Sequence, residues 1–408
     1  MKSNDRIPST QQWYHSLAQL IDSTKNCQAD ELAWLVNVAT KPLGLELTFY
    51  IIDHEQRQLH ALPEKGKPTA ESIQVDGTVA GHAFMFGSPV QSGPPIRWWV
   101  PLVDGSERLG VVSVTATGGT EWSPSLLRRC EVLIGLAGHL VTTKMPYGDQ
   151  LRLVRRTRPM SPASELILAM LPPLTFTSPR AVITALVEPA YDVGGDGFDY
   201  AVDGATAHLA VFDAMGHGLS AATTGAVALS ALRAARREGA SLTDMAQAAD
   251  QAIIHQFGDL RFVTCLLAEL NVETGHLRLI NAGHWPPLLI RKGRALKDLT
   301  GGNRLPLGLG SAPPEPAVEA MEPGDWLLLY TDGVIEARNP EGELFGIERL
   351  ISLIERQAAS DLSAAETLRR LGHHIVAYQD GPLHDDATMM LVEWRGHDVR
   401  HDTDTTGM

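Results

Sequence analysis

The stretch from Tyr191 to Gly218 constrains the fold of this chain more than any other. Its glycine-rich turn carries Asp196 and Asp199, and the apolar run His208–Phe212 ends at Asp213. An apolar run between turn residues predicts a buried β-strand, so one carboxylate lies in a turn and another at a strand end. Such carboxylates, with no Lys or Arg beside them, suit a hard divalent cation such as Mg²⁺ or Mn²⁺. The alternative is two ordinary acidic turns, since Asp and Gly are common turn residues.

Two further turns also place carboxylates at strand ends. The apolar run 326–330 leads into Asp332, and Asp385 and Asp386 come immediately before the apolar run 388–393. A single aspartate in such a position is usually a turn former. Four aspartates that each lie at the end of an apolar strand are less easily explained as turn formers alone, because strand ends meet at one edge of a sheet. We therefore expect these carboxylates to converge.

The composition sets wider limits. A chain of 408 residues with 44% hydrophobic and 20% charged residues predicts a soluble globular protein with two domains. The net charge of −14 argues against sequence-independent nucleic-acid binding. The cysteines Cys27, Cys130 and Cys265 are scattered and predict buried thiols in a reducing compartment. Because the sequence shows neither a signal-like N-terminus nor an 18-residue apolar run, we expect a cytoplasmic protein without membrane segments.

The N-terminal part predicts an α+β domain. Asp76 or Thr78 is expected to cap one of its helices, and Ser123, followed by Pro124, is expected to cap the last helix. The elements follow the order helix, helix, strands, helix, hairpin, helix. The periodicities predict helices over 13–21, 29–38 and 123–143, a turn that opens a short helix within 75–84, and strands over 43–52, 58–62, 98–103 and 109–114.

Two segments carry a resemblance to a known family. GTVAGHAFMFGSPV, followed by RWWVPLVDGSERLGVVSV, resembles a GAF domain over residues 10–145, after a flexible tail at 1–9. The resemblance implies a sheet with helices on one side that senses a small molecule. Trp98 or Trp99 is a candidate for lining the ligand pocket, and the alternative is that they are core or domain-contact residues. The ligand and its binding residues are not readable.

A basic, proline-containing linker is predicted over 146–173, with a helix at 163–170. The pattern then changes to strands with glycine-rich turns. The order of the elements predicts two sheets between helices, and a flexible polar tail follows at 396–408. The expected strands are 181–188, 200–202, 206–213, 262–270, 276–280, 288–291, 326–330 and 388–393, and the expected helices are 220–237, 242–257, 347–358 and 363–377.

Seven motifs in this half carry a second resemblance. They are VGGDGFDY, VFDAMGHGLSAA, INAGHWPPLLI, LPLGLG, LLLYTDGVIEARN, ELFGIERL and DDATMMLV. In this order they resemble the stage II sporulation protein E-like branch of the metal-dependent PPM/type 2C serine/threonine phosphatases. The resemblance implies an α-β-β-α sandwich phosphatase domain over 174–395 that follows the GAF sensor domain.

The same resemblance implies roles for individual residues. Asp196, Asp213, Asp332 and Asp385 match the catalytic metal ligands, with Asp213 bridging two Mn²⁺ or Mg²⁺ ions. Asp386 matches a polar residue that supports the ligands, and Asp199 matches an acidic residue of uncertain role. For His217 we weigh two alternatives, a turn residue near the metals and a proton donor to the leaving oxygen. His284 is expected to be structural.

One residue departs from the family pattern. The family commonly has Gly after the bridging aspartate, where the backbone carbonyl contacts a metal, and this chain has Ala214. The carbonyl ligand is retained if alanine adopts the required backbone conformation. A positive φ would cost about 1 kcal/mol or more.

The resemblance implies phosphomonoester hydrolysis by a metal-activated water, regulated by the GAF domain. The implied protein substrate is a phosphorylated anti-sigma-factor antagonist in bacterial signalling, and linkers of this kind lead us to expect a homodimer. An alternative is a non-catalytic scaffold that binds phosphoprotein. A hydrolase of small phosphate esters would need a phosphate cradle such as GxxxxGK[ST], which the sequence lacks.

Overall fold

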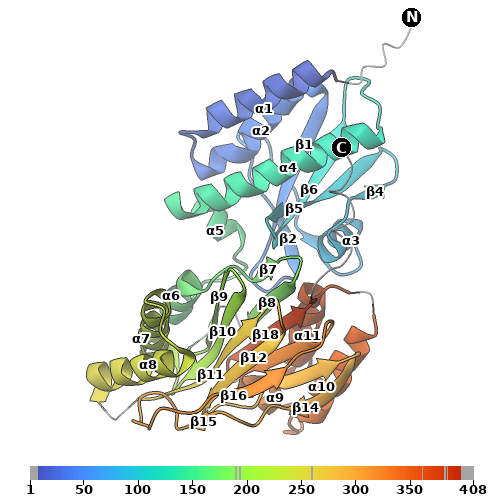
Figure 1. The fold of residues 1–408 in the computed structure, drawn as a ribbon. Helices are drawn as coiled ribbons and strands as arrows, with labels where there is room; N and C mark the ends of the chain where they lie inside the picture. The colour runs from blue at the N-terminus through green and yellow to red at the C-terminus, as the bar shows by residue number, and fades with distance from the viewer. Residues whose placement is uncertain are drawn as a thin grey trace, which may run out of the picture. The chain divides into compact units, whose positions relative to one another are not determined.

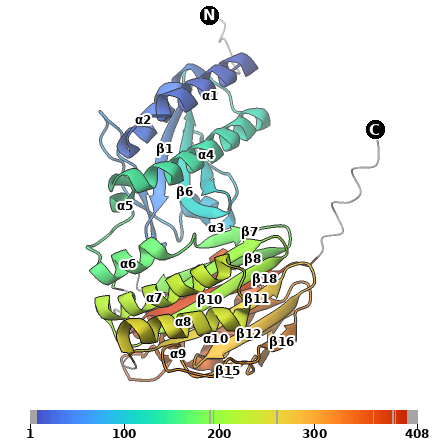
Figure 2. The same cartoon turned by 60° about the vertical axis from the view of Figure 1, so that its left-hand side comes forward.

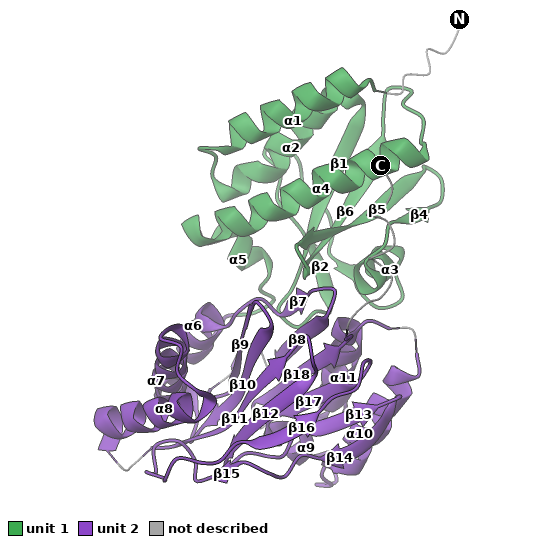
Figure 3. Cartoon of the chain, viewed as in Figure 1, with its two compact units in different colours: residues 1–158 green, residues 159–408 purple. Residues whose placement is uncertain are grey.

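A computed structural model describes residues 8–188, 191–192, 194–258, 261–360, 362–380, 383 and 385–396. The chain divides into two compact units, residues 1–158 and 159–408 (Figure 3). This division lies inside the segment 146–173 that we predicted as a linker, and the predicted limits of the domains stay predictions. Most of both predicted tails lies outside the described residues. No helix in the described part of the chain is long and apolar enough to cross a membrane.

Unit 1 is built on a six-stranded antiparallel sheet with the strand order β3-β2-β1-β6-β5-β4 (Figure 1). Its strands are β1 (Leu45–Ile52), β2 (Gln58–Ala61), β3 (Ile73–Gln74), β4 (Val90–Ser92), β5 (Arg97–Asp104) and β6 (Glu107–Ala116). Its helices are α1 (Thr10–Thr24), η1 (Ala29–Glu31), α2 (Leu32–Thr40), η2 (Lys41–Leu43), α3 (Val79–Phe86), α4 (Pro124–Lys144), η3 (Met145–Tyr147) and α5 (Gln150–Val154).

Helices cover both faces of this sheet, whereas the GAF resemblance implies helices on one side. Because successive side chains of a strand point to opposite faces, β1 contributes side chains to two hydrophobic cores. Phe49 and Ile51 pack in a core with α1, α2 and α4, while Tyr50 and Ile52 pack in a second core with α3. The short helix α3, which begins after a glycine-containing turn, closes the face that the other helices leave open.

The two neighbouring tryptophans of unit 1 divide between these cores. Trp99 belongs to the α3 core, and its ring centroid lies 5.6 Å from that of Tyr50. Trp98 packs against the other core, beside Trp122. Of the two alternatives for this pair, the structure supports core residues.

Two predicted helix caps are confirmed in unit 1. The Ser123 hydroxyl accepts a hydrogen bond from the backbone N–H of Leu126 at 3.1 Å, at the start of α4. The Thr78 hydroxyl accepts one from the N–H of Gly81 at 3.0 Å, at the start of α3. Thr78 is therefore the cap, and not Asp76.

Unit 2 contains two sheets. The first sheet has the order β15-β12-β11-β10-β9, with β16 also paired to β12, and the second has the order β14-β13-β17-β18-β8-β7. The first consists of β9 (Gly197–Asp203), β10 (Thr206–Ala214), β11 (Val263–Asn271), β12 (His276–Ala282), β15 (Asn303–Arg304) and β16 (Ala317–Ala320). The second consists of β7 (Thr175–Thr177), β8 (Ala181–Glu188), β13 (Leu288–Arg291), β14 (Arg294–Asp298), β17 (Trp326–Tyr330) and β18 (Ala387–Trp394).

Helices lie on the outer faces of the two sheets, so unit 2 is an α-β-β-α sandwich (Figures 1 and 2). On β10, Leu209 and Val211 face the core between the sheets, whereas Phe212 faces α7 and α8. On β18, Val392 faces the same central core, whereas Leu391 faces α10 and α11. The helices of this unit are α6 (Pro162–Met170), α7 (Gly218–Arg237), α8 (Leu242–Phe257), α9 (Asp332–Glu336), α10 (Gly346–Ala358) and α11 (Ala364–Gln379).

Candidate active site

Asp213 is the second-last residue of β10, and it pairs with Thr264 of β11. The residue is half-buried. Burial and the nearby negative charges of Asp332, Asp385 and Asp386 together raise the pKa of its carboxyl to about 7. The carboxylates that the sequence places at three separate strand ends therefore lie close enough to act on one another.

Asp332 begins the short helix α9, directly after β17. Burial raises the pKa of its carboxyl, and the charge of Asp385 adds to the shift. Gly333 allows this turn to approach the second one, because a Cβ at this position would overlap the backbone carbonyl of Asp386. The glycine in the TDG sequence is thus required for the approach of the two acidic turns.

Asp196 is almost completely buried, and it is held by a hydroxyl from the other sheet. The hydroxyl of Thr331 donates a hydrogen bond of 2.6 Å to Asp196 Oδ2, and Thr331 Oγ1 accepts one of 2.9 Å from the N–H of Thr388. Burial raises the pKa of the Asp196 carboxyl well above its usual range, and the charges of Asp213 and Asp386 add to this. Thr331 was not identified from the sequence.

Asp386 holds the glycine-rich turn. Its Oδ2 accepts hydrogen bonds from the backbone N–H groups of Gly194 at 2.6 Å, Gly195 at 2.9 Å and Asp196 at 3.4 Å. Three N–H groups around one carboxylate oxygen form a compact anion-binding turn. Burial raises the pKa of the Asp386 carboxyl, and these hydrogen bonds work against that shift. The side chain therefore fixes the position of Asp196.

Asp385 precedes Asp386 and is exposed to solvent. Its Oδ1 accepts a hydrogen bond of 2.9 Å from the N–H of Asp386. We call Asp196, Asp213, Asp332, Asp385 and Asp386 the acidic cluster. None of the five forms an ion pair with Lys or Arg in the described part of the chain.

Ala214 lies at the end of β10, in register with Val263. It is buried, and its N–H donates a hydrogen bond of 3.3 Å to the carbonyl of Gly195. Ala214 is not among the described non-glycine residues with positive φ, which are Gln56, Lys292 and Asp380. The strained conformation that we considered for this alanine therefore does not occur.

Asp199 does not join the acidic cluster. Its two carboxylate oxygens accept hydrogen bonds from Arg233 at 2.7 Å and from Arg236 at 2.6 Å, both on α7. Arg233 also donates a hydrogen bond of 2.7 Å to the carbonyl of Met170, at the end of α6. Asp199 thus ties the helix layer to β9.

The two histidines of the motifs differ in their surroundings. His217 is exposed immediately before α7, and its side chain accepts no capping hydrogen bond. His284 contacts Thr264 Oγ1 through Nδ1 at 2.8 Å and the carbonyl of Tyr330 through Nε2 at 3.1 Å. Burial lowers its pKa to about 4, so the ring is neutral at pH 7. His284 is structural, as predicted, because it joins the two sheets.

Among the described residues, no three His, Cys, Asp or Glu side chains converge closely enough to hold a metal ion. The chemistry of the cluster nevertheless fits a divalent cation, since hard oxygen donors gather without a cationic side chain. The raised pKa values reflect mutual repulsion and burial, which a bound cation would offset.

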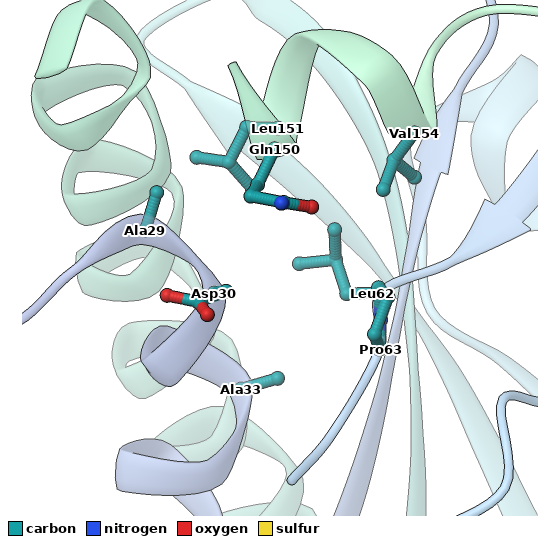
Figure 4. A pocket seen from close by; sticks show the side chains of 8 residues that line it. All are labelled: Ala29, Asp30, Ala33, Leu62, Pro63, Gln150, Leu151 and Val154. Atoms are coloured by element: carbon teal, nitrogen blue, oxygen red, sulfur yellow. The ribbon is translucent and has the colours of Figure 1, made fainter. Parts of the chain in front are cut away.

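Unit 1 contains a small pocket between its helices and the end of β2 (Figure 4). Its cavity volume is about 10 Å³, which is roughly the room that one water molecule needs. The short helix α5 supplies one wall, with Gln150, Leu151 and Val154. The other lining residues are Ala29, Asp30, Ala33, Leu62 and Pro63.

Unit 2 is an α-β-β-α sandwich with carboxylates at the ends of its strands. Comparison with known proteins identifies the family to which this domain belongs. Residues 203–395 match the family described as stage II sporulation protein E (SpoIIE). This part of the chain is therefore a SpoIIE-type PP2C phosphatase domain. The match includes Asp213, Asp332, Asp385 and Asp386, whereas Asp196 lies before its start.

Several known proteins are similar to this chain. Phosphoserine phosphatase RsbU of Bacillus subtilis (strain 168) is 27% identical over 214 residues, which are 52% of this chain and 62% of RsbU. Protein IcfG of Synechocystis sp. is 31% identical over 144 residues, 34% of this chain and 22% of IcfG. The structure of the RsbU and RsbW domains of Rv1364c from Mycobacterium tuberculosis is 25% identical, with a TM-score of 0.49, and the similarity covers 56% of this chain and 64% of that one. The chain thus spans less than two thirds of each relative.

Proposed function

We propose that this chain is a metal-dependent protein phosphatase that hydrolyses phosphoserine and phosphothreonine. The observation that carries the proposal is the acidic cluster, whose carboxylates from separate strand ends influence one another without a Lys or Arg partner. Its location in a SpoIIE-type domain, and the name of the similar RsbU, point to the same reaction.

Two Mn²⁺ or Mg²⁺ ions are the proposed cofactors, held by Asp196, Asp213, Asp332 and Asp385 and by the carbonyl of Ala214. Ions bound there would lower the pKa of a coordinated water and offset negative charge on the phosphate oxygens. The remaining residues of the site position these ligands.

The chain prepares the ligands by hydrogen bonds and packing. Thr331 stabilises the charged form of Asp196 by donating to Oδ2, and Asp386 holds the turn that carries Asp196. A cysteine nucleophile is not available at this site, because Cys265 is fully buried and burial strongly raises the pKa of its thiol. The proposed reaction therefore needs no covalent phospho-enzyme.

The proposed substrate is a phosphorylated anti-sigma-factor antagonist, in a bacterial signalling pathway of the cytoplasm. Its support is the resemblance of the motifs in unit 2 and the similarity to RsbU. A homodimer is part of the same proposal.

We further propose that unit 1 is a GAF sensor that regulates unit 2. Its support is the pocket of Figure 4, because α5 forms one wall of that pocket and belongs to the predicted linker. A ligand that enlarged this narrow pocket would shift α5 and, through the linker, helix α7 behind Asp213. Deleting residues 1–145 is expected to change the rate of phosphate hydrolysis, and an unchanged rate would refute this regulation.

The central test is hydrolysis of an aryl phosphate in the presence of Mn²⁺, with wild type beside Asp213→Asn. The wild type is expected to hydrolyse the ester and the variant to lose nearly all activity, since the amide keeps the shape of the side chain but removes its charge. Equal rates would refute the metal assignment. A wild type that binds phosphopeptide but hydrolyses nothing would favour the scaffold alternative.

A further inference from the structure

Large apolar side chains are exposed beside the acidic cluster. Among the described residues of unit 2, eight large hydrophobic side chains are exposed, and five of them lie on three neighbouring segments. We call these five residues the apolar rim. They are Met215, Leu219, Trp285, Leu305 and Leu309.

The three segments leave the same edge of the first sheet. Thr264 pairs with Asp213, the next residue Cys265 pairs with Ala282, and Ala282 pairs with Arg304. Asp213, Ala282 and Arg304 therefore end their strands side by side, and the chain continues from each into a rim segment. The rim thus borders the edge at which the carboxylates gather.

Backbone hydrogen bonds connect two of these segments through the start of β11. The N–H of Met215 donates to the carbonyl of Phe262 at 3.1 Å. Val263 and Leu307 exchange two backbone hydrogen bonds of 2.9 Å each. Met215 and the segment around Leu307 are consequently neighbours at the same strand end.

The turn that carries Trp285 is fixed from both sides. The Asn281 side chain accepts a hydrogen bond of 2.7 Å from the N–H of His284 and donates one of 2.9 Å to the carbonyl of His284. The ring of His284 contacts the carbonyl of Tyr330, two residues before Asp332. Trp285 follows directly and is 44% exposed. The turn that carries Trp285 is therefore fixed against Tyr330, close to the end of β17 that leads into Asp332.

The segment that carries Leu305 and Leu309 is also anchored. Asp250 of α8 accepts a hydrogen bond of 2.8 Å from the N–H of Gly308 and pairs with Arg304 at 3.0 Å. Leu307 is fully buried. The two exposed leucines therefore stand on a rigid loop, so their exposure does not result from a loose segment.

The rim segments carry no charge. Residues 214–220, 283–287 and 305–310 contain no Asp, Glu, Lys or Arg, although 20% of the chain is charged. Exposed apolar patches of this kind mark surfaces that bind other proteins. The complementary surface on a partner is apolar and uncharged around one phosphate group.

We infer that the apolar rim is the docking surface for the protein substrate and selects phosphorylated serines or threonines whose neighbours are apolar. The inference rests on the proposed function for the reaction that follows docking. Recognition then comes from the burial of apolar surface around the phosphate and not from ion pairs.

Two peptides test this inference. Both carry a phosphonate analogue of phosphoserine that cannot be hydrolysed, flanked in one by Leu and Val and in the other by Asp and Glu. Fluorescence anisotropy with the full-length protein and Mn²⁺ gives the two Kd values. We expect a Kd at least about tenfold lower for the apolar peptide, because each good apolar contact contributes on the order of 1 kcal/mol.

Variants of the apolar rim test whether these residues cause the preference for the apolar peptide. Combining Trp285→Ser with Leu305→Ser is expected to bring the two Kd values together, whereas the control Leu296→Ser, an exposed leucine on the edge strand β14 of the second sheet, keeps the preference. Equal Kd values in wild type, or a preference that survives in the double variant, would overturn the inference. Hydrolysis of an aryl phosphate by the same preparations reports on the proposed function separately, so a preference without any hydrolysis would contradict that function and leave the docking surface in place.

Discussion

The hydroxyl of Thr331 donates a 2.6 Å hydrogen bond to the carboxylate of Asp196, and the two residues are 135 positions apart in the sequence. Both side chains are buried. The bond joins the end of β17, in the second sheet, to the glycine-rich turn that precedes β9, in the first sheet. It is therefore a direct link between the two sheets at the acidic cluster.

Replacing Thr331 by Val tests that link. Valine keeps the shape of the side chain but removes the donor, which leaves the buried Asp196 carboxylate less stabilised. Loss of one partner of a buried hydrogen bond to a charged group costs about 1–3 kcal/mol. We expect the free energy of unfolding, measured in urea, to fall by this amount and the Mn²⁺-dependent hydrolysis of an aryl phosphate to fall at least about tenfold. Thr331→Ser retains the hydroxyl and serves as the control, and equal activity of the Val and Ser variants would contradict the role of the bond.

Asp199 is expected to act on stability and not on metal binding. Its carboxylate is buried between Arg233 and Arg236, and removal of one partner of a buried ion pair typically costs about 3–5 kcal/mol. Asp199→Asn is thus expected to lower the free energy of unfolding by about 3 kcal/mol. The Mn²⁺ concentration for half-maximal activity should stay within about twofold of wild type.

The matched control is Glu269→Gln, which removes a more exposed ion pair with Arg278 on the same sheet. Exposed pairs contribute about 0–1 kcal/mol, so this variant should unfold almost like wild type. A large rise in the Mn²⁺ requirement of Asp199→Asn, with little change in stability, would instead place Asp199 among the metal ligands.

The main elements of the fold could be predicted because their periodicities are strong. Helix α8 and the strands β8, β13 and β17 have the predicted limits, and most other helices differ by a few residues. The short edge strands were not predicted, among them β15 and β16. Segments as short as β15 and β16 show too little periodicity to be recognised in the sequence. They are strands only because they pair with β12. The placement of α3 on the second face of the unit 1 sheet also depends on tertiary packing.

The approach of the acidic turns could be predicted in part. Strand ends followed by Asp and Gly indicate which carboxylates meet, and Asp213 and Asp332 do influence each other. The sequence could not indicate that Asp386 would anchor the turn of Gly194, or that Thr331 would hold Asp196, because these contacts join segments of different sheets. The ion pairs of Asp199 were missed for the same reason, although arginines three residues apart on α7 were a usable signal.

Ala214→Gly tests whether the departure from the family pattern matters. Because Ala214 lies in a regular strand without positive φ, glycine brings no relief of strain. Glycine loses more backbone freedom on folding, so we expect the free energy of unfolding to fall by about 0.5–1 kcal/mol. Aryl phosphate hydrolysis and its Mn²⁺ dependence should stay within about twofold. A clear gain in metal affinity would show that alanine distorts the carbonyl ligand.

His284 makes the stability of the protein depend on pH. Its pKa is about 4 in the folded protein and about 6.5 in an unfolded chain, because burial disfavours the charged ring. The unfolded state therefore binds one more proton between these values, and the contribution of neutral His284 is complete above pH 6.5 and lost as the pH falls to about 4. A difference of this size corresponds to at most about 3 kcal/mol.

His284→Gln removes this titration, together with at least part of the hydrogen bonding to Thr264 and Tyr330. At pH 7 the variant is expected to be less stable than wild type by about 1–3 kcal/mol, since a buried partner is left unpaired. At pH 4.5 this difference in stability should shrink or reverse. At that pH the unfolded wild type gains a proton on His284 that the folded protein does not bind, which destabilises the wild type but not the variant. Urea unfolding of both proteins at the two pH values measures the change. A stability difference that is the same at pH 7 and pH 4.5 would show that His284 is not held neutral by the fold.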